Sequence, residues 1–249
     1  MNNNVAFVDA GVLFSFITSA PQPKQTVQNQ NDILDSTLLA QLAADKKYSR
    51  FQKSQDWYRY YTDTLGELGW DNPFFNFDDY FPKNKTFTLK DVVIHIFQKL
   101  ANDQKISNAE LVLVEDTINI FNKLANDDKR VNIYNSFTNF VAVDNSNASS
   151  SDVNNPGEII PLKDLRTINL QVDVVDQSLN LASVGIILTT KQKIEKKLFT
   201  QGFLTSLVQG KITSVSYLAS LNEGIYSQVR KQVIEKLGDK REQFILKLI

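Results

Sequence analysis

The chain has 249 residues, with 27 lysines and arginines against 28 aspartates and glutamates, a single histidine and no cysteine. The absence of cysteine excludes disulfides, thiolate nucleophiles and cysteine-bound zinc or iron–sulfur centres. The balanced charge lacks the basic excess that is typical of nucleic-acid binding, so we expect no nucleic-acid partner, and it leaves little electrostatic repulsion between copies of the chain.

The N-terminal region divides into two parts before the main domain begins. Residues 1–20 are apolar, and residues 21–32 (PQPKQTVQNQND) have the composition of an extended polar linker. Asp9 interrupts the apolar run, no positively charged region precedes it, and Pro21 follows the one plausible cleavage site, so we expect no classical signal peptide. The sequence thus predicts an N-terminal arm (1–20), a linker (21–32) and a single domain (33–249), in a soluble protein that is cytoplasmic or released by a non-classical route.

The first part of the domain has helical periodicity. Apolar residues recur at helical spacing over 38–43 and again over 57–68, where Ser54 is a start signal and Gly69 a stop signal. The aromatic stretch 74–81 then indicates an edge strand or an aromatic loop.

Two further helices follow, each with a recognisable start. Thr88 precedes an apolar helical face over 89–100, and Ser107 with Glu110 has the spacing of a capping box before the apolar positions of 111–125.

After residue 137 the periodicity changes from about 3.6 to 2, which indicates strands. In the segment 168–174 apolar residues alternate with Asn169, Gln171 and Asp173, the pattern of a half-buried strand. Further strands are expected at 139–143, 181–190, 193–200, 203–209 and 211–219. A final helix over 223–237, with Gly238 as its C-cap, completes an α+β fold: N-terminal helices, an antiparallel meander sheet and a C-terminal helix, with the helices packed on the sheet.

No motif points to catalysis, a metal or a cofactor. His95 lies at the flank of an apolar helix face, where a surface histidine is the ordinary interpretation, and the loop from Asp144 fails the calcium-loop pattern at three positions. Asp78 and Asp79 lie among aromatic residues and fit an exposed strand better than a catalytic carboxylate pair. We therefore expect no catalytic residues, no metal and no cofactor.

Lysines are concentrated between residues 191 and 197. On a strand, Lys191, Lys193 and Lys197 would share one face, which either guards a sheet edge against aggregation or contacts an anionic membrane. We favour the edge-guarding interpretation.

Three stretches resemble a poorly characterised microbial protein family: LDSTLLAQLAADKKYSR (34–50), DWYRYYTDTLGELGW (56–70) and IYSQVRKQVIEKLG (225–238). The resemblance covers the body, residues 32–249, and implies a fold but no activity or site. The order of helices and strands is also similar to that of Cyt-type insecticidal cytolysins and related virulence factors, which implies an antiparallel sheet between helices.

Three functions are consistent with these features. The favoured hypothesis is a non-enzymatic structural or interaction protein that forms homo-oligomers or filaments by exchanging its apolar arm with a neighbouring copy. The alternatives are a Cyt-like membrane-active toxin or virulence factor, and an enzyme that relies on carboxylates with lysine or tyrosine. The residues expected to mediate self-association are Val5, Phe7, Val8, Val12, Leu13, Phe14, Phe16 and Ile17.

Overall fold

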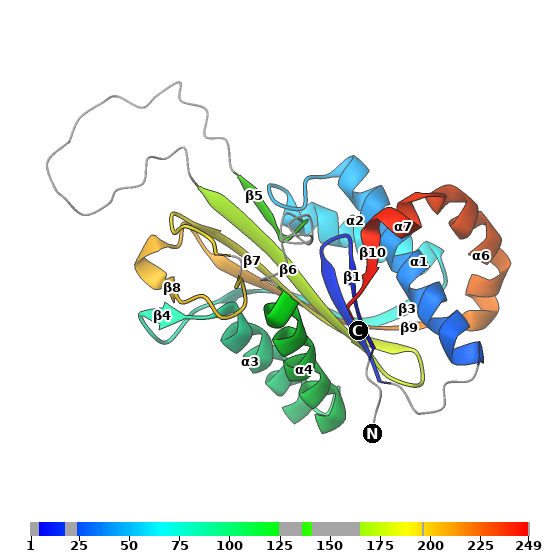
Figure 1. Cartoon of the computed structure of the whole chain (residues 1–249), viewed down its shortest axis with the longest axis horizontal. Coiled ribbons are helices and arrows are strands. Elements are labelled where there is room, and N and C mark those ends of the chain that lie inside the picture. Colours follow the sequence, from blue (N-terminus) through cyan, green and yellow to red (C-terminus); the bar gives the residue numbers. More distant parts are fainter. Residues whose placement is uncertain (1–4, 18–23, 125–135, 141–164, 196, 249) are drawn as a thin grey trace, which may run out of the picture.

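A mixed β-sheet of eight strands, with helices on both faces, organises the chain (Figure 1). The structure is a computed structural model and describes residues 5–17, 24–124, 136–140, 165–195 and 197–248. The architecture confirms the α+β class that the sequence predicts.

The strand order of the main sheet is β10-β1-β2-β6-β7-β9-β3, and β5 pairs with β6 beside β2. The strands β6, β7, β9 and β3 pair antiparallel in that order, whereas β2 pairs with β6 in parallel, so the sheet is mixed rather than a simple antiparallel meander. The strands of this sheet are β1 (Val5–Asp9), β2 (Val12–Phe16), β3 (Trp70–Tyr80), β5 (Thr138–Phe140), β6 (Arg166–Val175), β7 (Asn180–Thr190), β9 (Ile212–Leu221) and β10 (Ile245–Lys247).

Among the described residues, four helices lie on one face of the sheet. Their apolar side chains pack on Phe14 of β2, Val215 of β9 and neighbouring residues, where Trp57, Tyr58 and Tyr61 are fully enclosed. These helices are α1 (Lys24–Lys47), α2 (Ser54–Glu67), α6 (Glu223–Leu237) and α7 (Lys240–Phe244).

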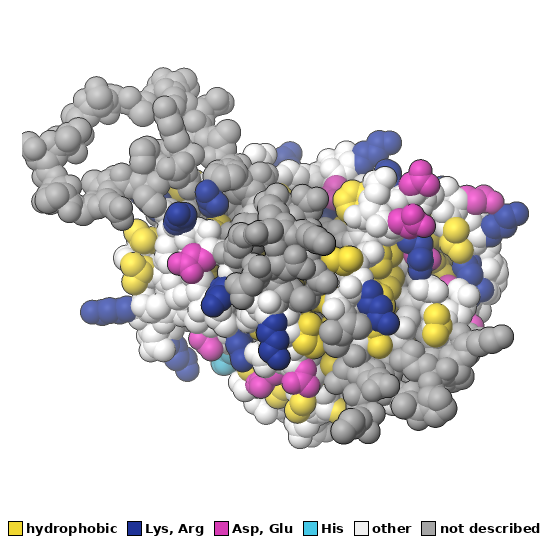
Figure 2. Space-filling model, in the orientation of Figure 1, with side chains coloured by type: hydrophobic (Ala, Val, Ile, Leu, Met, Phe, Trp, Pro, Cys, Tyr) yellow, Lys and Arg dark blue, Asp and Glu magenta, His cyan; other side chains and the backbone are white. Residues whose placement is uncertain are grey.

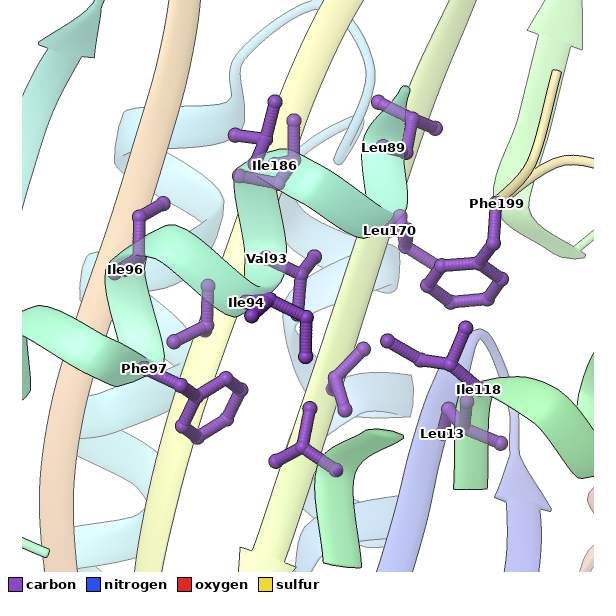
Figure 3. Packing of buried hydrophobic residues seen from close by; sticks show 14 of the residues in the cluster. Leu13, Leu89, Val93, Ile94, Ile96, Phe97, Ile118, Leu170, Ile186 and Phe199 are labelled. Atoms are coloured by element: carbon purple, nitrogen blue, oxygen red, sulfur yellow. The ribbon is translucent and has the colours of Figure 1, made fainter. Parts of the chain in front are cut away.

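Two helices, α3 (Leu89–Asn102) and α4 (Asn108–Leu124), lie on the opposite face. Figure 3 shows their side chains, among them Phe97 and Ile118, gathered with Leu13, Leu170 and Ile186 of the sheet. The two helices contact mainly β2, β6 and β7. On this face α3 and α4 cover β9 and β3 less than they cover β2, β6 and β7.

Both predicted helix starts on this face are confirmed. The Thr88 side chain accepts a hydrogen bond from the backbone N–H of Asp91. The Ser107 backbone N–H donates to the Glu110 carboxylate, while the Glu110 N–H donates to the Ser107 hydroxyl, which is a reciprocal capping box. At the C-terminus, Gly238 ends α6 with a φ of 49°, as predicted.

The predicted linker is wrong where the structure describes it. Residues 24–32 form the first turns of α1, and Asp32 pairs with Arg230 of α6 through two hydrogen bonds of 2.9 and 2.7 Å. The glutamines and asparagines of this stretch are compatible with helix, and tertiary contacts stabilise it.

The predicted lysine strand is also wrong. Residues 191–195 form bends and irregular backbone, so Lys191 and Lys193 do not line one face of a strand. The predicted strand 203–209 is interrupted: Phe203–Leu204 form β8, which pairs with β4 (Thr86–Phe87) in a separate two-stranded sheet, and residues 205–207 form a 3-10 turn. Val208 forms an isolated bridge with Thr190. The loop 144–157 lies outside the described residues.

Candidate functional site

The eight apolar residues predicted to mediate self-association lie in the sheet of their own chain, as the hairpin β1–β2. Val5, Phe7 and Ile17 are half-buried, and five have exposed fractions of 3% or less: Val8, Val12, Leu13, Phe14 and Phe16. Arg50 stabilises the turn of the hairpin, because its Nη1 donates a 2.8 Å hydrogen bond to the carbonyl of Ala10. An arm exchange would have to remove this hairpin from the core before it could reach a neighbour.

The opposite end of the sheet is formed by β3, an edge strand of 11 residues. The backbone N–H of Leu221, in β9, donates to the carbonyl of Leu179 on the side of β7. The backbone N–H of Asn222 donates to the carbonyl of Gly69 on the opposite side, that of β3. Because backbone groups alternate in direction along a strand, even-numbered residues of β9 point to β3.

The register of β3 with β9 then determines which backbone N–H and C=O groups of β3 point away from the sheet. Even-numbered residues from Phe74 to Tyr80 are opposite even-numbered residues of β9 and bond inward. The backbone groups of Phe75, Phe77 and Asp79 therefore point away from the sheet. No other strand of the described residues pairs with them.

The two ends of β3 carry features that discourage strand pairing, and its middle does not. A register shift between Asp71 and Phe74 surrounds Pro73, and two acidic residues, Asp78 and Asp79, lie near the other end. Between them the sequence FFNF combines high strand propensity with no charge, and the Phe75 side chain is 42% exposed. This edge has the properties of a pairing surface.

A groove of about 470 Å³ runs beside this edge, between α3 and the strands β9 and β3. Its floor includes Asn76, Asp78, Ser214 and Ser216, polar residues on the face of the sheet that carries α3 and α4. Lys105, 3.6 Å above the ring of Phe74, borders this groove and a neighbouring cavity of about 620 Å³ under the turn between α3 and α4.

The titratable residues singled out in the sequence do not form a catalytic arrangement among the described residues. His95 is exposed, as expected, and its ring faces Tyr80 at 6.0 Å between ring centres. Asp79 pairs with Lys211 at 2.5 Å. The described part of the chain contains no group of three or more histidine and acidic side chains that could hold a metal ion.

A buried polar network lies on the other face of the sheet, under α1 and α2. Asn169, Gln171 and Asp173 of β6 have exposed fractions of 3% or less, so the prediction of a half-buried strand is wrong: both faces of β6 are covered. Gln171 Nε2 donates to both oxygens of the Asp173 carboxylate, at 3.0 and 3.1 Å, and to the hydroxyl of Tyr217 at 2.8 Å.

The same network reaches α2 and the loop that precedes it. The Tyr217 hydroxyl donates to that of Tyr61 at 3.2 Å. The Tyr58 hydroxyl donates to Asn169 Oδ1 at 3.1 Å, and Asn169 Nδ2 donates to the carbonyl of Arg50 at 2.7 Å. These hydrogen bonds hold α2 on the sheet. They involve polar side chains of β6 that the alternating sequence pattern predicts to be exposed to solvent.

Burial also changes the ionisation of two carboxyl groups in this layer. Loss of water raises the pKa of Asp173 to about 7, although the Ser183 and Gln171 side chains lower it in part. Loss of water likewise raises the pKa of Asp9 well above its usual value, opposed by the hydrogen bond from Thr37 and by the charge of Arg50. One oxygen of Asp9 has no hydrogen-bond partner in the structure, which agrees with a neutral carboxyl.

We expect the substitution Gly185→Ala to disrupt this network. A Cβ at position 185 would lie 2.5 Å from the hydroxyl of Tyr58, a fully buried side chain that is hydrogen-bonded to Asn169. The substitution should lower the free energy of unfolding by about 1–3 kcal/mol, as measured by urea denaturation. Gly66→Ala is the matched control because nothing lies within 4 Å of its added Cβ; equal effects of the two substitutions would contradict the packing described.

Among the described residues no helix is long and apolar enough to cross a membrane. No family model matches the sequence, and no curated protein matches it. The chain is similar to a solved structure described as that of the Evf virulence factor, at 12% identity and a TM-score of 0.35, over 94% of this chain and 82% of the other. This is a weak structural likeness to a virulence factor. The identity and the TM-score are too low for any property of that protein to be assigned to this chain.

Proposed function

We propose that this chain is a non-enzymatic structural protein that assembles with copies of itself by pairing β-strands at the open edge β3. The observation that carries the proposal is the row of outward-pointing backbone groups at Phe75, Phe77 and Asp79, on the side of β3 that pairs with no strand of the described residues. Phe75 and Phe77 lie in the uncharged middle of the strand. Strand addition at such an edge satisfies the main-chain groups and places alternate side chains against the partner.

The charge of the molecule is compatible with this function. The net charge is −1, so copies of the chain repel one another little. On the face seen in Figure 2, basic and acidic side chains are interspersed and no field of one sign extends over it. Assembly by edge pairing replaces the arm exchange expected from the sequence, since the hairpin β1–β2 is occupied within its own sheet.

Proline at position 75 tests the proposal. Phe75→Pro removes an N–H that points outward, so the ladder to β9 stays intact while strand addition loses a hydrogen bond and meets the proline ring. We expect wild-type protein to form concentration-dependent assemblies in size-exclusion chromatography with light scattering. The Phe75→Pro chain should remain monomeric with a circular dichroism spectrum like that of the wild type.

Two control variants distinguish an effect on pairing at the β3 edge from an effect on the stability of the fold. Phe75→Ala keeps the outward N–H and should retain assembly in a weakened form. Asn76→Pro removes a group that bonds inward, opposite Ser216, and should lower stability instead. A wild-type chain that stays monomeric across the concentration range, or a Phe75→Pro chain that assembles normally, would contradict the proposed function.

A further inference from the structure

The open part of the β3 edge is short and has clear ends. The outward backbone N–H of Asp79 already donates a 2.8 Å hydrogen bond to the side chain of Asp78. At the other end, Pro73 has no N–H to donate. The outward N–H and C=O groups of Phe75 and Phe77 lie between these ends, and no strand of the described residues pairs with them. A partner strand therefore gains most by pairing with these two residues.

A second copy of β3 matches this short row of groups. A twofold axis perpendicular to the sheet makes the two β3 strands antiparallel and keeps each face of the sheet continuous across the contact. With the axis at Asn76, Phe75 of each copy lies opposite Phe77 of the other, and each such pair exchanges two hydrogen bonds. Asp79 then lies opposite Pro73, where one N–H is absent and the other is already bonded.

The same register brings aromatic side chains together on the face that carries α2. Phe77 packs on the core there, edge-on to Tyr58. Phe75 stacks on Tyr217 at 6.5 Å between ring centres, yet its side chain remains 42% exposed. Across the axis, Phe75 of one copy lies beside Phe77 of the other, and aromatic pairs on neighbouring strands stabilise a sheet. The pairing thus gives the exposed ring of Phe75 a partner.

On the opposite face the register brings opposite charges together. Asp78 of one copy lies opposite Phe74 of the other, and the Lys105 ammonium lies 3.6 Å from the centre of the Phe74 ring. The exposed Asp78 of each copy therefore comes within reach of Lys105 in the other copy. Within its own chain Lys105 lies 3.8 Å from Asp103, and an ammonium group has three donors, so it can bind a second carboxylate.

Other registers of the same two strands are less favourable. An axis at Phe77 places Phe75 opposite Asp79, whose N–H is already bonded. An axis at Asp78 places the two Asp78 carboxylates opposite each other, and like charges on neighbouring strands destabilise the pairing. An axis at Phe75 places Phe77 opposite Pro73, which has no N–H. The axis at Asn76 avoids all three conflicts.

The other edges of the main sheet are less suited to pairing. Among the described residues these edges are formed by β5 and β10, which have three residues each. The strand β10 also ends at the exposed Lys247, and short edge strands with lysine discourage the addition of a further strand. A contact through β3 is therefore not continued at the far side of the sheet.

We propose that β3 pairs with β3 of a second copy about a twofold axis at Asn76, which produces a closed dimer with one continuous sheet. This inference rests on the proposed function, because it names the partner strand and the register of the β3 edge. An isologous contact of this kind uses the same surface on both copies, so each favourable contact occurs twice.

Cysteine cross-linking tests the register, because the chain has no cysteine of its own. The two Cα atoms at position 76 form a pair without backbone hydrogen bonds and lie about 4.5 Å apart, which suits a disulfide. Asn76→Cys should therefore give a covalent dimer under mild oxidation, seen by non-reducing electrophoresis. Asp78→Cys is the matched control, because its two Cα atoms lie roughly 14 Å apart in this register. Adding Phe75→Pro to Asn76→Cys should abolish the cross-link.

Charge exchange tests the contact between Asp78 and Lys105, with sedimentation velocity over a dilution series as the readout. Asp78→Lys alone and Lys105→Asp alone each put like charges together at both contacts, and each should raise the dimer dissociation constant roughly tenfold. An equimolar mixture of the two variants should form heterodimers like wild type, because both contacts then join opposite charges. Lys236→Glu changes an exposed lysine of α6 and should have no effect.

The outcomes distinguish this inference from the function on which it rests. Loss of assembly in Phe75→Pro, without a cross-link in Asn76→Cys, would keep the role of β3 and overturn the register. A mixture of the two charge variants that stays monomeric would overturn the register as well. Growth beyond a dimer would overturn the closed contact, and a wild-type chain that does not assemble would overturn both proposals.

Discussion

Deletion of residues 1–20 is expected to unfold the chain rather than to release a folded body. The deletion removes β1 and β2 and leaves β6 without its parallel neighbour over Gln171–Val175. It also removes the buried side chains of Leu13 and Phe14, which belong to the cores on opposite faces of the sheet. Burial of five such side chains stabilises the fold by on the order of 10 kcal/mol, which is comparable to the whole stability of a typical domain.

Circular dichroism and thermal unfolding of the truncated chain provide the measurement. We expect the cooperative transition to disappear and the near-ultraviolet signal of the aromatic core to be lost. Phe14→Ala serves as a milder version, with an expected loss of about 3–5 kcal/mol, whereas the half-buried Phe7→Ala should cost less. A truncated chain that keeps its transition and fails only to assemble would restore the arm-exchange hypothesis.

Local signals were sufficient to predict much of the fold. The helices α3 and α4 begin at the residues that the capping patterns indicate, since a cap depends on groups within three or four residues of one another. The strands β7 and β9 and the helix α6 were predicted for similar reasons, and β3 matches one of the two interpretations of the aromatic stretch, the edge strand. Each depends on a pattern that is contained in its own segment.

Long-range pairing could not be predicted in the same way. The parallel contact of β2 with β6 joins Ser15 to Val174 across most of the chain, and β10 joins β1 from the other terminus. An apolar segment at the start of a chain has the same composition whether it is a free arm or a central strand. The polar stretch 24–32 has the composition of a linker, yet it begins α1.

The candidate site was predicted only in part. The sequence indicates an aromatic strand with acidic residues, but which of its backbone groups are open depends on its register with β9.

The polar residues of β6 show most clearly why local patterns have limits. Alternation of Asn169, Gln171 and Asp173 with apolar residues is typical of a strand with one face in water. In the structure that face is covered by α2, and the polar side chains have hydrogen-bond partners there: Tyr58 of α2 donates to Asn169, and Gln171 donates to Tyr217 of β9. These two tyrosines lie 111 and 46 residues away in the sequence, so the local periodicity of β6 does not indicate them.

Asp173 gives this layer a predicted dependence on pH. Its pKa is raised from 3.8 to about 7 in the folded chain. The folded state therefore holds a proton that the unfolded state has lost, at pH values between about 4 and 7. The stability contributed by the neutral carboxyl is fully present below about pH 4 and is lost as the pH rises through 7. At 1.36 kcal/mol for each pKa unit, the loss over this interval is on the order of 4 kcal/mol.

The substitution Asp173→Asn should remove this dependence, because an amide has nearly the shape of a protonated carboxyl and does not ionise. We expect the two chains to have similar free energies of unfolding near pH 4, and the variant to be more stable by several kcal/mol at pH 8. Urea denaturation across this range measures the difference directly. Asp63→Asn, the same change at an exposed position of α2, should shift the curve little at any pH. If Asp173→Asn were less stable than wild type at pH 8, the ionised carboxylate would have to be stabilised by its hydrogen bonds more than burial destabilises it. The assignment of Asp173 as a neutral, buried member of the network at mildly acidic pH would then be wrong.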